Sequence, residues 1–182
     1  MAAVDLLRHR WNRHEYDLLD PEAFRRTELI DGEILRVPAM SQRHIFTTTT
    51  LLVKLAELTA GRHWVSGQTP IILDDFSEPE PDVWVRLAAP TSLEDVKPFP
   101  ADLLLVAEVA DTSFGSDKAF KIPTYARAGV PLVWLVDVRR RTITVYFDPV
   151  DGVYTQEATT APSADVALPW GGTLAIAQLF IG

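Results

Sequence analysis

Apolar and polar residues alternate along the chain with two different periods, and each period predicts a different kind of element. The run LLLVAEVA (103–110) is almost continuously apolar, which is typical of a strand buried on both faces of a sheet. Shorter β-prone runs predict further strands at HWVSGQ (63–68), TPIILD (69–74), PDVWVRL (81–87), VPLVWLVDV (130–138), TITVYFD (142–148) and VYTQEA (153–158). The pattern therefore predicts one sheet of many strands.

Helical spacing occurs in two longer segments. Ser41 can cap a helix in which Ile45, Leu52, Leu55 and Leu58 recur at about helical intervals, and Gly61 would end it. A second helix is predicted over 119–128, ended by Gly129. A short helix is also expected at DPEAFRR (20–26), because an aspartate cap precedes a proline at the first turn, and TLAIAQLF (173–180) is a short amphipathic end.

TELIDGEILRV (27–37) reads as two short strands around Asp31-Gly32, a dipeptide that strongly favours a tight hairpin. No repeat, linker or low-complexity tract interrupts the pattern. We therefore expect residues 1–182 to form a single domain of the α/β or α+β class, with helices against one sheet and a β-hairpin near the amino terminus.

Composition narrows the function classes. The 182 residues contain no cysteine, which excludes disulfides, cysteine-based zinc sites and cysteine nucleophiles and fits the cytoplasm. The opening MAAVDLLRHRW lacks the apolar core of a signal peptide, and no segment has the roughly 18 apolar residues of a membrane span. A net charge of −8 argues against a simple basic-patch binder of nucleic acid.

Glu108 is a carboxylate inside the most apolar run of the chain, and a buried lone carboxylate must be neutralised or used. Strand alternation places it on one face with Leu104, Val106 and Ala110. Asp82 is the last residue of the acidic segment DDFSEPEPD (74–82) and lies at the start of another predicted strand, just after Pro81. If the two strands pair, both carboxylates could converge on one hard cation such as Mg²⁺.

Several motifs follow one another in a fixed order: E-L-I-D-G-E, S-x-x-H, P-D-V, E-V-x-D-T-S, D-x-x-x-K-x-x-x-Y-x-x-x-G-V and W-L-V-D. This succession, over residues 15–150, resembles the Uma-type restriction endonucleases, a bacterial branch of the PD-(D/E)XK nuclease superfamily. The resemblance implies a restriction-endonuclease-like core, with a central mixed β-sheet flanked by helices. It also implies Mg²⁺- or Mn²⁺-dependent cleavage of DNA phosphodiesters.

The resemblance assigns roles residue by residue. Asp82 matches the proline-aspartate position and Glu108 the strand carboxylate, so both would be metal ligands, with the backbone carbonyl of Val109 as a third. Glu28 matches an acidic position at the edge of the site, and His44 matches the histidine that opens the first long helix.

The lysine departs from the superfamily pattern. Two residues after Glu108 stands Ala110, and Lys121 on the following helix occupies the matching place instead, with Lys118 as an alternative. Asp117, Lys121 and Tyr125 are spaced to share one helical face. Pro123 leaves two readings open, because either the helix is kinked or it begins near Pro123 with Lys121 in the preceding turn.

Each of these residues also has a plain structural interpretation. Glu108 could end an edge strand in solvent, Asp82 could be one more solvated charge, His44 could be a surface histidine near a cap, and Tyr125 could simply pack. Trp64, Trp84, Trp134 and Trp170 are typical of core or interface positions, and the arginines 139–141 of a solvated turn.

The sequence thus favours a metal-dependent DNA endonuclease that uses Asp82, Glu108 and Lys121, and its acidity suggests a homodimer that aligns local arginines. The alternative is a binding or structural module that kept the fold and lost cleavage, which Ala110, Pro123 and the acidity favour. Hydrolysis of another phosphoester is a third hypothesis.

Overall fold

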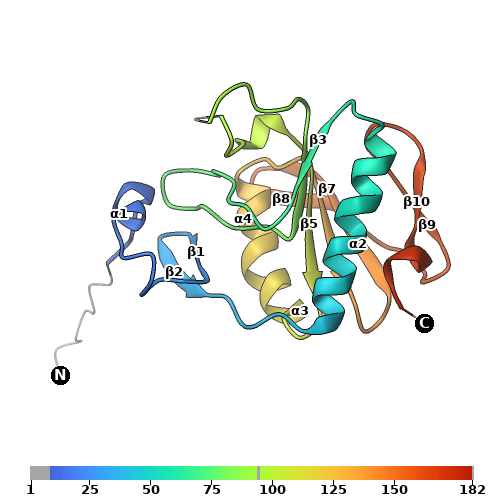
Figure 1. The fold of residues 1–182 in the computed structure, drawn as a ribbon, viewed down its shortest axis with the longest axis horizontal. Coiled ribbons are helices and arrows are strands. Elements are labelled where there is room, and N and C mark those ends of the chain that lie inside the picture. Colours follow the sequence, from blue (N-terminus) through green and yellow to red (C-terminus); the bar gives the residue numbers. More distant parts are fainter. Residues whose placement is uncertain (1–8, 94, 182) are drawn as a thin grey trace.

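The computed structural model describes residues 9–93 and 95–181. Its centre is a six-stranded sheet in the order β3-β4-β5-β6-β7-β8 (Figure 1). The strands are β3 (Trp64–Ser66), β4 (Val83–Arg86), β5 (Leu103–Ala110), β6 (Leu132–Asp137), β7 (Thr142–Val150) and β8 (Val153–Thr159). β5 and β6 are parallel and the other neighbours are antiparallel, so the sheet is mixed, as expected.

Each face of the sheet is covered by helical structure, and each has its own core. α2 (Gln42–Thr59) packs Leu51 and Leu55 against one face, where β9 (Asp165–Ala167), β10 (Thr173–Ala175) and η3 (Ile176–Leu179) add further apolar residues. The other face is covered by a helical run of three pieces: α3 (Phe114–Ser116), the π turn η2 (Asp117–Lys121) and α4 (Ile122–Arg127). This run is the crossover that joins the parallel strands β5 and β6.

The amino-terminal hairpin is confirmed. β1 (Thr27–Ile30) pairs with β2 (Glu33–Arg36), and the turn residues Asp31 and Gly32 have φ of 53° and 81°. Both values suit the tight turn predicted from the Asp-Gly dipeptide. In Figure 1 the hairpin lies at the side of the molecule near α4, opposite the C-terminal strands.

The first long helix is also confirmed, but its buried face differs from the expected one. The Ser41 hydroxyl accepts the His44 N–H at 3.1 Å, which caps the helix, and Ala60 ends it with a left-handed φ of 51° just before Gly61. Ile45 is 48% exposed, although its spacing predicted burial. The threonines Thr47 and Thr48 are buried instead, because the sheet meets the helix along their side.

Two local predictions are wrong. Residues 20–26 form turns rather than a helix, because the Asp20 carboxylate accepts the Glu22 N–H in a tight turn and Arg26 has a φ of 57°. TPIILD does not form a strand: the N–H groups of Ile71 and Leu73 bond Pro79 and Ser77 within an extended loop. Neither α1 (Arg13–Asp17) nor the pairing of β9 with β10 was predicted from the sequence.

A register shift in the sheet corrects one detail of the predicted alternation. Arg86 pairs with Leu103 while Val85 pairs with Leu105, so Leu104 is an extra residue opposite β4. Leu104 therefore packs on the α2 side, whereas Val106 and Ala110 pack on the α4 side. Beyond this irregularity the alternation holds.

The arginine triplet joins β6 to β7 as a turn, as predicted. Arg140 pairs with the buried Asp137 at 2.7 Å, and the Arg139 side chain bonds Asp111 at 2.9 Å. Trp84 and Trp134 are core residues, whereas Trp64 is 44% exposed. The opening residues 1–8, which include most of the stretch inspected for a signal peptide, lie outside the described residues. Among the described helices, none is both long enough and apolar enough to cross a bilayer.

Candidate active site

Glu108 is buried in β5, and two groups from the crossover helix meet its carboxylate. The Lys121 ammonium lies 3.2 Å from the carboxylate, and the Tyr125 hydroxyl donates a hydrogen bond of 2.5 Å to Oε1. Alternation puts Glu108 on the α4 side of the sheet, which is why this helix and not α2 reaches it. The buried carboxylate is thus paired with a cation and a phenol, and the solvent-exposed edge interpretation is wrong.

The helix that carries Lys121 is continuous from 114 to 127 but contains a π turn. The N–H of Ile122 bonds the carbonyl of Asp117, five residues earlier, and α4 starts at Ile122 with Pro123 in its first turn. Proline has no N–H to donate, and the π turn directly before it departs from the regular α-helical hydrogen-bond pattern. Of the two interpretations left open by the sequence, neither holds in full: Lys121 lies in the turn before α4, but that turn is itself helical, so the helix does not begin at Pro123.

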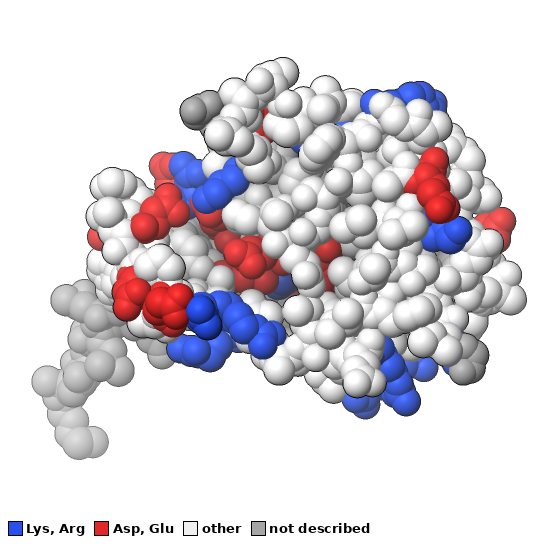
Figure 2. Space-filling model, viewed as in Figure 1, with Lys and Arg blue, Asp and Glu red and all other residues white. Residues whose placement is uncertain are grey.

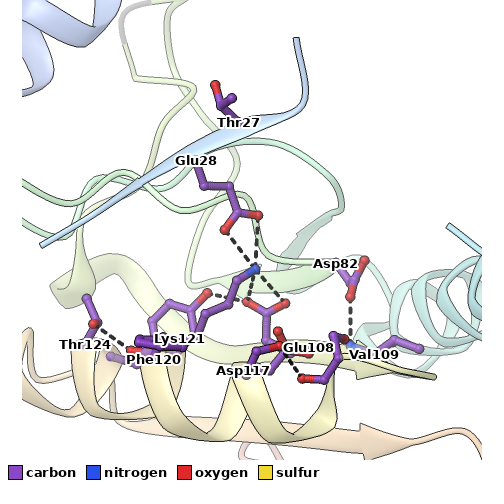
Figure 3. A network of polar contacts seen from close by, with 12 residues as sticks. Thr27, Glu28, Asp82, Glu108, Val109, Asp117, Phe120, Lys121 and Thr124 are labelled. Carbon is purple, nitrogen blue, oxygen red and sulfur yellow. Dashed lines mark hydrogen bonds and ion pairs between the residues drawn. The ribbon is translucent and has the colours of Figure 1, made fainter. Parts of the chain in front are cut away.

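Glu28 on β1 is the second carboxylate that contacts Lys121. The ammonium lies 3.0 Å from the Glu28 carboxylate, and both side chains are largely buried (Figure 3). The hairpin is anchored where it turns, since Asp31 accepts a hydrogen bond from Thr124 at 3.2 Å and pairs with Arg127. The hairpin therefore delivers Glu28 to a helix 93 residues further along the chain.

Asp82 lies beside the same site, just before β4. Its Oδ2 accepts the Val109 N–H at 2.8 Å, and its Oδ1 lies 2.7 Å from His44 Nε2. Val109 directly follows Glu108, so this bond fixes the two acidic residues next to each other. The structure therefore brings all five predicted side chains together: Glu28, His44, Asp82, Glu108 and Lys121. His44 is not a free surface histidine, because it holds Asp82.

Two further residues of the site were not given a role by the sequence. Tyr125 was expected to pack, and it does, but its hydroxyl also holds Glu108. Asp117 accepts a hydrogen bond of 2.5 Å from the Ser113 hydroxyl and lies near Lys121. The spacing of Asp117, Lys121 and Tyr125 was the only signal for both residues.

The electrostatics of the site follow from burial and an excess of acids. Burial raises the pKa of Glu28, Glu108 and Asp117, and neighbouring carboxylates add to each shift. Burial works to lower the pKa of Lys121, but Glu108 and Glu28 outweigh it and raise that pKa, so the ammonium stays charged. Burial likewise opposes the charge on His44, while the hydrogen bond to Asp82 raises its pKa overall.

Four carboxylates thus share the site with one ammonium. Glu28 and Glu108 contact Lys121 and Asp117 lies near it, whereas Asp82 is held by His44 and the Val109 N–H. Figure 2 shows acidic side chains gathered in the hollow between the hairpin and α2. Carboxylate oxygens in excess over cations suit a hard divalent ion such as Mg²⁺. Within the described part of the chain, however, no three His, Asp or Glu side chains converge closely enough to hold a metal. The carboxylates are ligands of the kind that Mg²⁺ prefers, and Lys121 lies between two of them, Glu28 and Glu108.

Comparison with known proteins agrees with this architecture. Residues 13–177 match the model of the Uma2 family, described as "Putative restriction endonuclease". The chain belongs to the Uma2 family. Its fold is similar to the crystal structure of a protein from Anabaena variabilis ATCC 29413, described as "a putative nuclease belonging to DUF820". That similarity has a TM-score of 0.68 at 18% identity, and it covers 85% of this chain and 89% of the other.

The Uma2 match covers most of the chain and includes every candidate site residue. No curated protein matches the sequence. The expected restriction-endonuclease-like fold is therefore confirmed, and the family supports a nuclease function. Metal dependence and the nature of the substrate are matters for the proposal below.

Proposed function

We propose that this Uma2 protein is a metal-dependent endonuclease that hydrolyses phosphodiester bonds of DNA. The observation that carries the proposal is the contact of the Lys121 ammonium with the buried Glu108 carboxylate, in a hollow rich in acids. A buried ion pair adds little to the stability of an apolar strand, so a catalytic role best explains why Glu108 and Lys121 are there.

Each side chain has a defined task in this reaction. Asp82 and Glu108 would hold the divalent ion, with His44 and Tyr125 fixing the direction of their carboxylates. Lys121 would donate to a phosphate oxygen and stabilise the negative charge that develops there. An ion such as Mg²⁺ supplies Lewis acidity and makes a bound water more acidic. The carbonyl of Val109 remains a candidate third ligand.

Lys121 also compensates for the missing amine at Ala110. In the usual superfamily pattern the carboxylate and the lysine project from the same strand. Here the amine of Lys121 comes from the π turn and contacts the carboxylate of Glu108. Glu28 would hold the ammonium in place until a phosphate replaces one of its contacts. The departure from the superfamily pattern therefore does not by itself argue for an inactive module.

The proposal is tested with supercoiled plasmid DNA and the purified protein in Mg²⁺, Mn²⁺ or EDTA. We expect nicking with either ion and none in EDTA. Lys121→Met should lower the rate by about 10²–10³, as loss of one preorganised charge does elsewhere. Glu108→Gln should abolish cleavage.

Lys118→Met is the matched control, because Lys118 pairs with Glu157 at 3.0 Å on the surface, away from Glu108. Equal rates for the two lysine variants would contradict the proposed role of Lys121. Binding of DNA without cleavage in any ion would favour the inactive binding module. Cleavage of RNA or of a simple phosphodiester, but not of DNA, would show that the proposed substrate is wrong.

A homodimer is part of the same proposal. Two copies would present two sites to the two strands of a duplex, and pairing would let arginines such as Arg43 and Arg139 offset the net charge of −8. The homodimer remains a prediction.

A further inference from the structure

An open groove runs beside the site, between α2 and the loop before Thr69. Its volume is about 260 Å³, and its lining is mostly apolar. The lining residues are Met40, Ile45, Thr48, Thr49, Leu52, Gly67, Gln68 and Asp82. Asp82 is thus shared between the groove and the proposed catalytic site, so a molecule in the groove would lie next to the reacting group.

The floor of the groove depends on Gly67. A Cβ at this position would lie 2.5 Å from the Asp82 carbonyl oxygen and 2.8 Å from Leu52 Cδ1. A side chain would fit there only by displacing one of these two groups. The bare glycine therefore lets the loop close against Asp82 and gives the groove its depth.

One polar side chain in the groove lacks an adequate partner. The Gln68 side-chain amide donates to the weakly accepting Met40 sulfur, at 2.9 Å, and its backbone is held at a φ of 52°.

We propose that this groove binds one unstacked nucleobase of the nucleic-acid strand being cleaved. This inference rests on the proposed nuclease function and names its substrate class: a strand with an unpaired base next to the scissile phosphate. The phosphate would lie toward Lys121, and the neutral base would enter the groove past Asp82.

Size and chemistry both favour a base. The groove is slightly smaller than the roughly 300 Å³ at which pockets for drug-sized ligands begin, which suits a single planar ring system. Ile45, Leu52 and Met40 offer apolar contact to its faces. Gln68 carries both a donor and an acceptor, as the edge of a base requires. A base in a duplex remains stacked, so the groove selects unpaired positions.

A phosphate or acidic peptide fits this groove less well, because Asp82 would repel it. An apolar side chain from a second copy could fill the walls but would leave the Gln68 amide donating to the Met40 sulfur. A base can contact both the walls and the Gln68 amide.

The test uses a short single strand that carries 2-aminopurine and an end label, with wild-type protein in Ca²⁺. We expect 2-aminopurine fluorescence to change on binding at one position of the strand, and an abasic site at that position to weaken binding at least tenfold. Thr49→Trp fills the groove from the exposed side of α2 and should weaken binding by a similar factor. Val53→Trp, one turn further and 46% exposed, should not.

Equal affinities for Thr49→Trp and Val53→Trp, or indifference to the abasic site, would overturn the inference. A change of oligomeric state in Thr49→Trp, seen by sedimentation, with unchanged strand binding would assign the groove to a second copy instead. Metal-dependent cleavage of duplex without any base signal would refute this inference alone, whereas base binding without cleavage in any ion would refute the nuclease alone.

Discussion

Glu108 illustrates how single residues make this site. Its carboxylate is removed from water by β5 and its neighbours, which would be prohibitive without the ammonium of Lys121 and the hydroxyl of Tyr125. Breaking such a buried pair by removing one partner costs about 3–5 kcal/mol in other proteins. The site is therefore held together by the same contacts that are proposed to act in cleavage.

The raised pKa of Glu108 makes stability depend on pH. Burial raises this pKa well above 4.5 in the folded protein, so the folded state binds the proton more tightly than the unfolded chain does. The favourable contribution is complete below the unfolded pKa and is lost as pH rises through the folded one. We expect the free energy of unfolding of wild type, relative to Glu108→Gln, to fall by up to about 1.4 kcal/mol per pH unit between these two pKa values.

Urea unfolding in EDTA at a series of pH values measures this difference. Glu108→Gln keeps the size of the side chain and removes its titration, so the comparison isolates one group from Glu28 and Asp117, whose raised pKa values act in the same direction. Parallel curves for the two proteins would show that Glu108 does not titrate differently on folding.

At the scale of elements, the site depends on how four segments approach one another. The π turn brings Lys121 to β5, the hairpin brings Glu28, α2 brings His44, and the loop before β4 brings Asp82. The loop that contains Gly67 lies directly against Asp82, and the Gln68 N–H bonds the Pro81 carbonyl at 3.0 Å. A small change in the conformation of this loop should therefore shift Asp82 and lower the rate of cleavage.

Gly67→Ala tests that dependence. The added Cβ would lie 2.5 Å from the Asp82 carbonyl, so the loop or β4 must shift. We expect a loss of about 1–3 kcal/mol in the free energy of unfolding and slower plasmid cleavage. Gly115→Ala is the control, because its Cβ would meet none of the described residues within 4 Å and alanine favours a helix. Equal thermal stabilities and equal cleavage rates for the two variants would contradict the close approach of the Gly67 loop to Asp82.

At the scale of the whole molecule, an acidic protein is proposed to bind an acidic polymer. The net charge is −8, and the acidic side chains gather where the scissile phosphate would lie (Figure 2). Like charges repel over a Debye length of about 10 Å at 0.1 M salt. A divalent ion in the site would remove much of that repulsion locally.

Divalent ions should therefore strengthen DNA binding by this protein. We expect Ca²⁺, in place of EDTA at constant ionic strength, to raise the affinity for a labelled duplex at least tenfold, measured by fluorescence anisotropy. Glu108→Gln, which lacks one proposed ligand, should lose most of this increase. If the variant responds to Ca²⁺ as wild type does, the ion acts elsewhere on the protein or on the DNA.

Elements with local signals could be predicted from the amino-acid sequence. β5 begins and ends where its apolar run does, the Asp-Gly turn specifies the hairpin, and Ser41 and Gly61 mark the ends of α2. Motif order also assigned the site residues, by resemblance to a family rather than by geometry. These signals succeed because backbone conformation and caps depend on neighbours in the chain.

Which side chains meet depends on how distant segments of the chain pack together. Lys121 contacts Glu28 across 93 residues and His44 contacts Asp82 across 38, and no local pattern encodes such distances. The same dependence explains the errors: Ile45 is exposed because the sheet meets another side of α2, and TPIILD bonds loop carbonyls rather than a neighbouring strand. Burial and pairing are properties of the partner surface, which a sequence pattern does not contain.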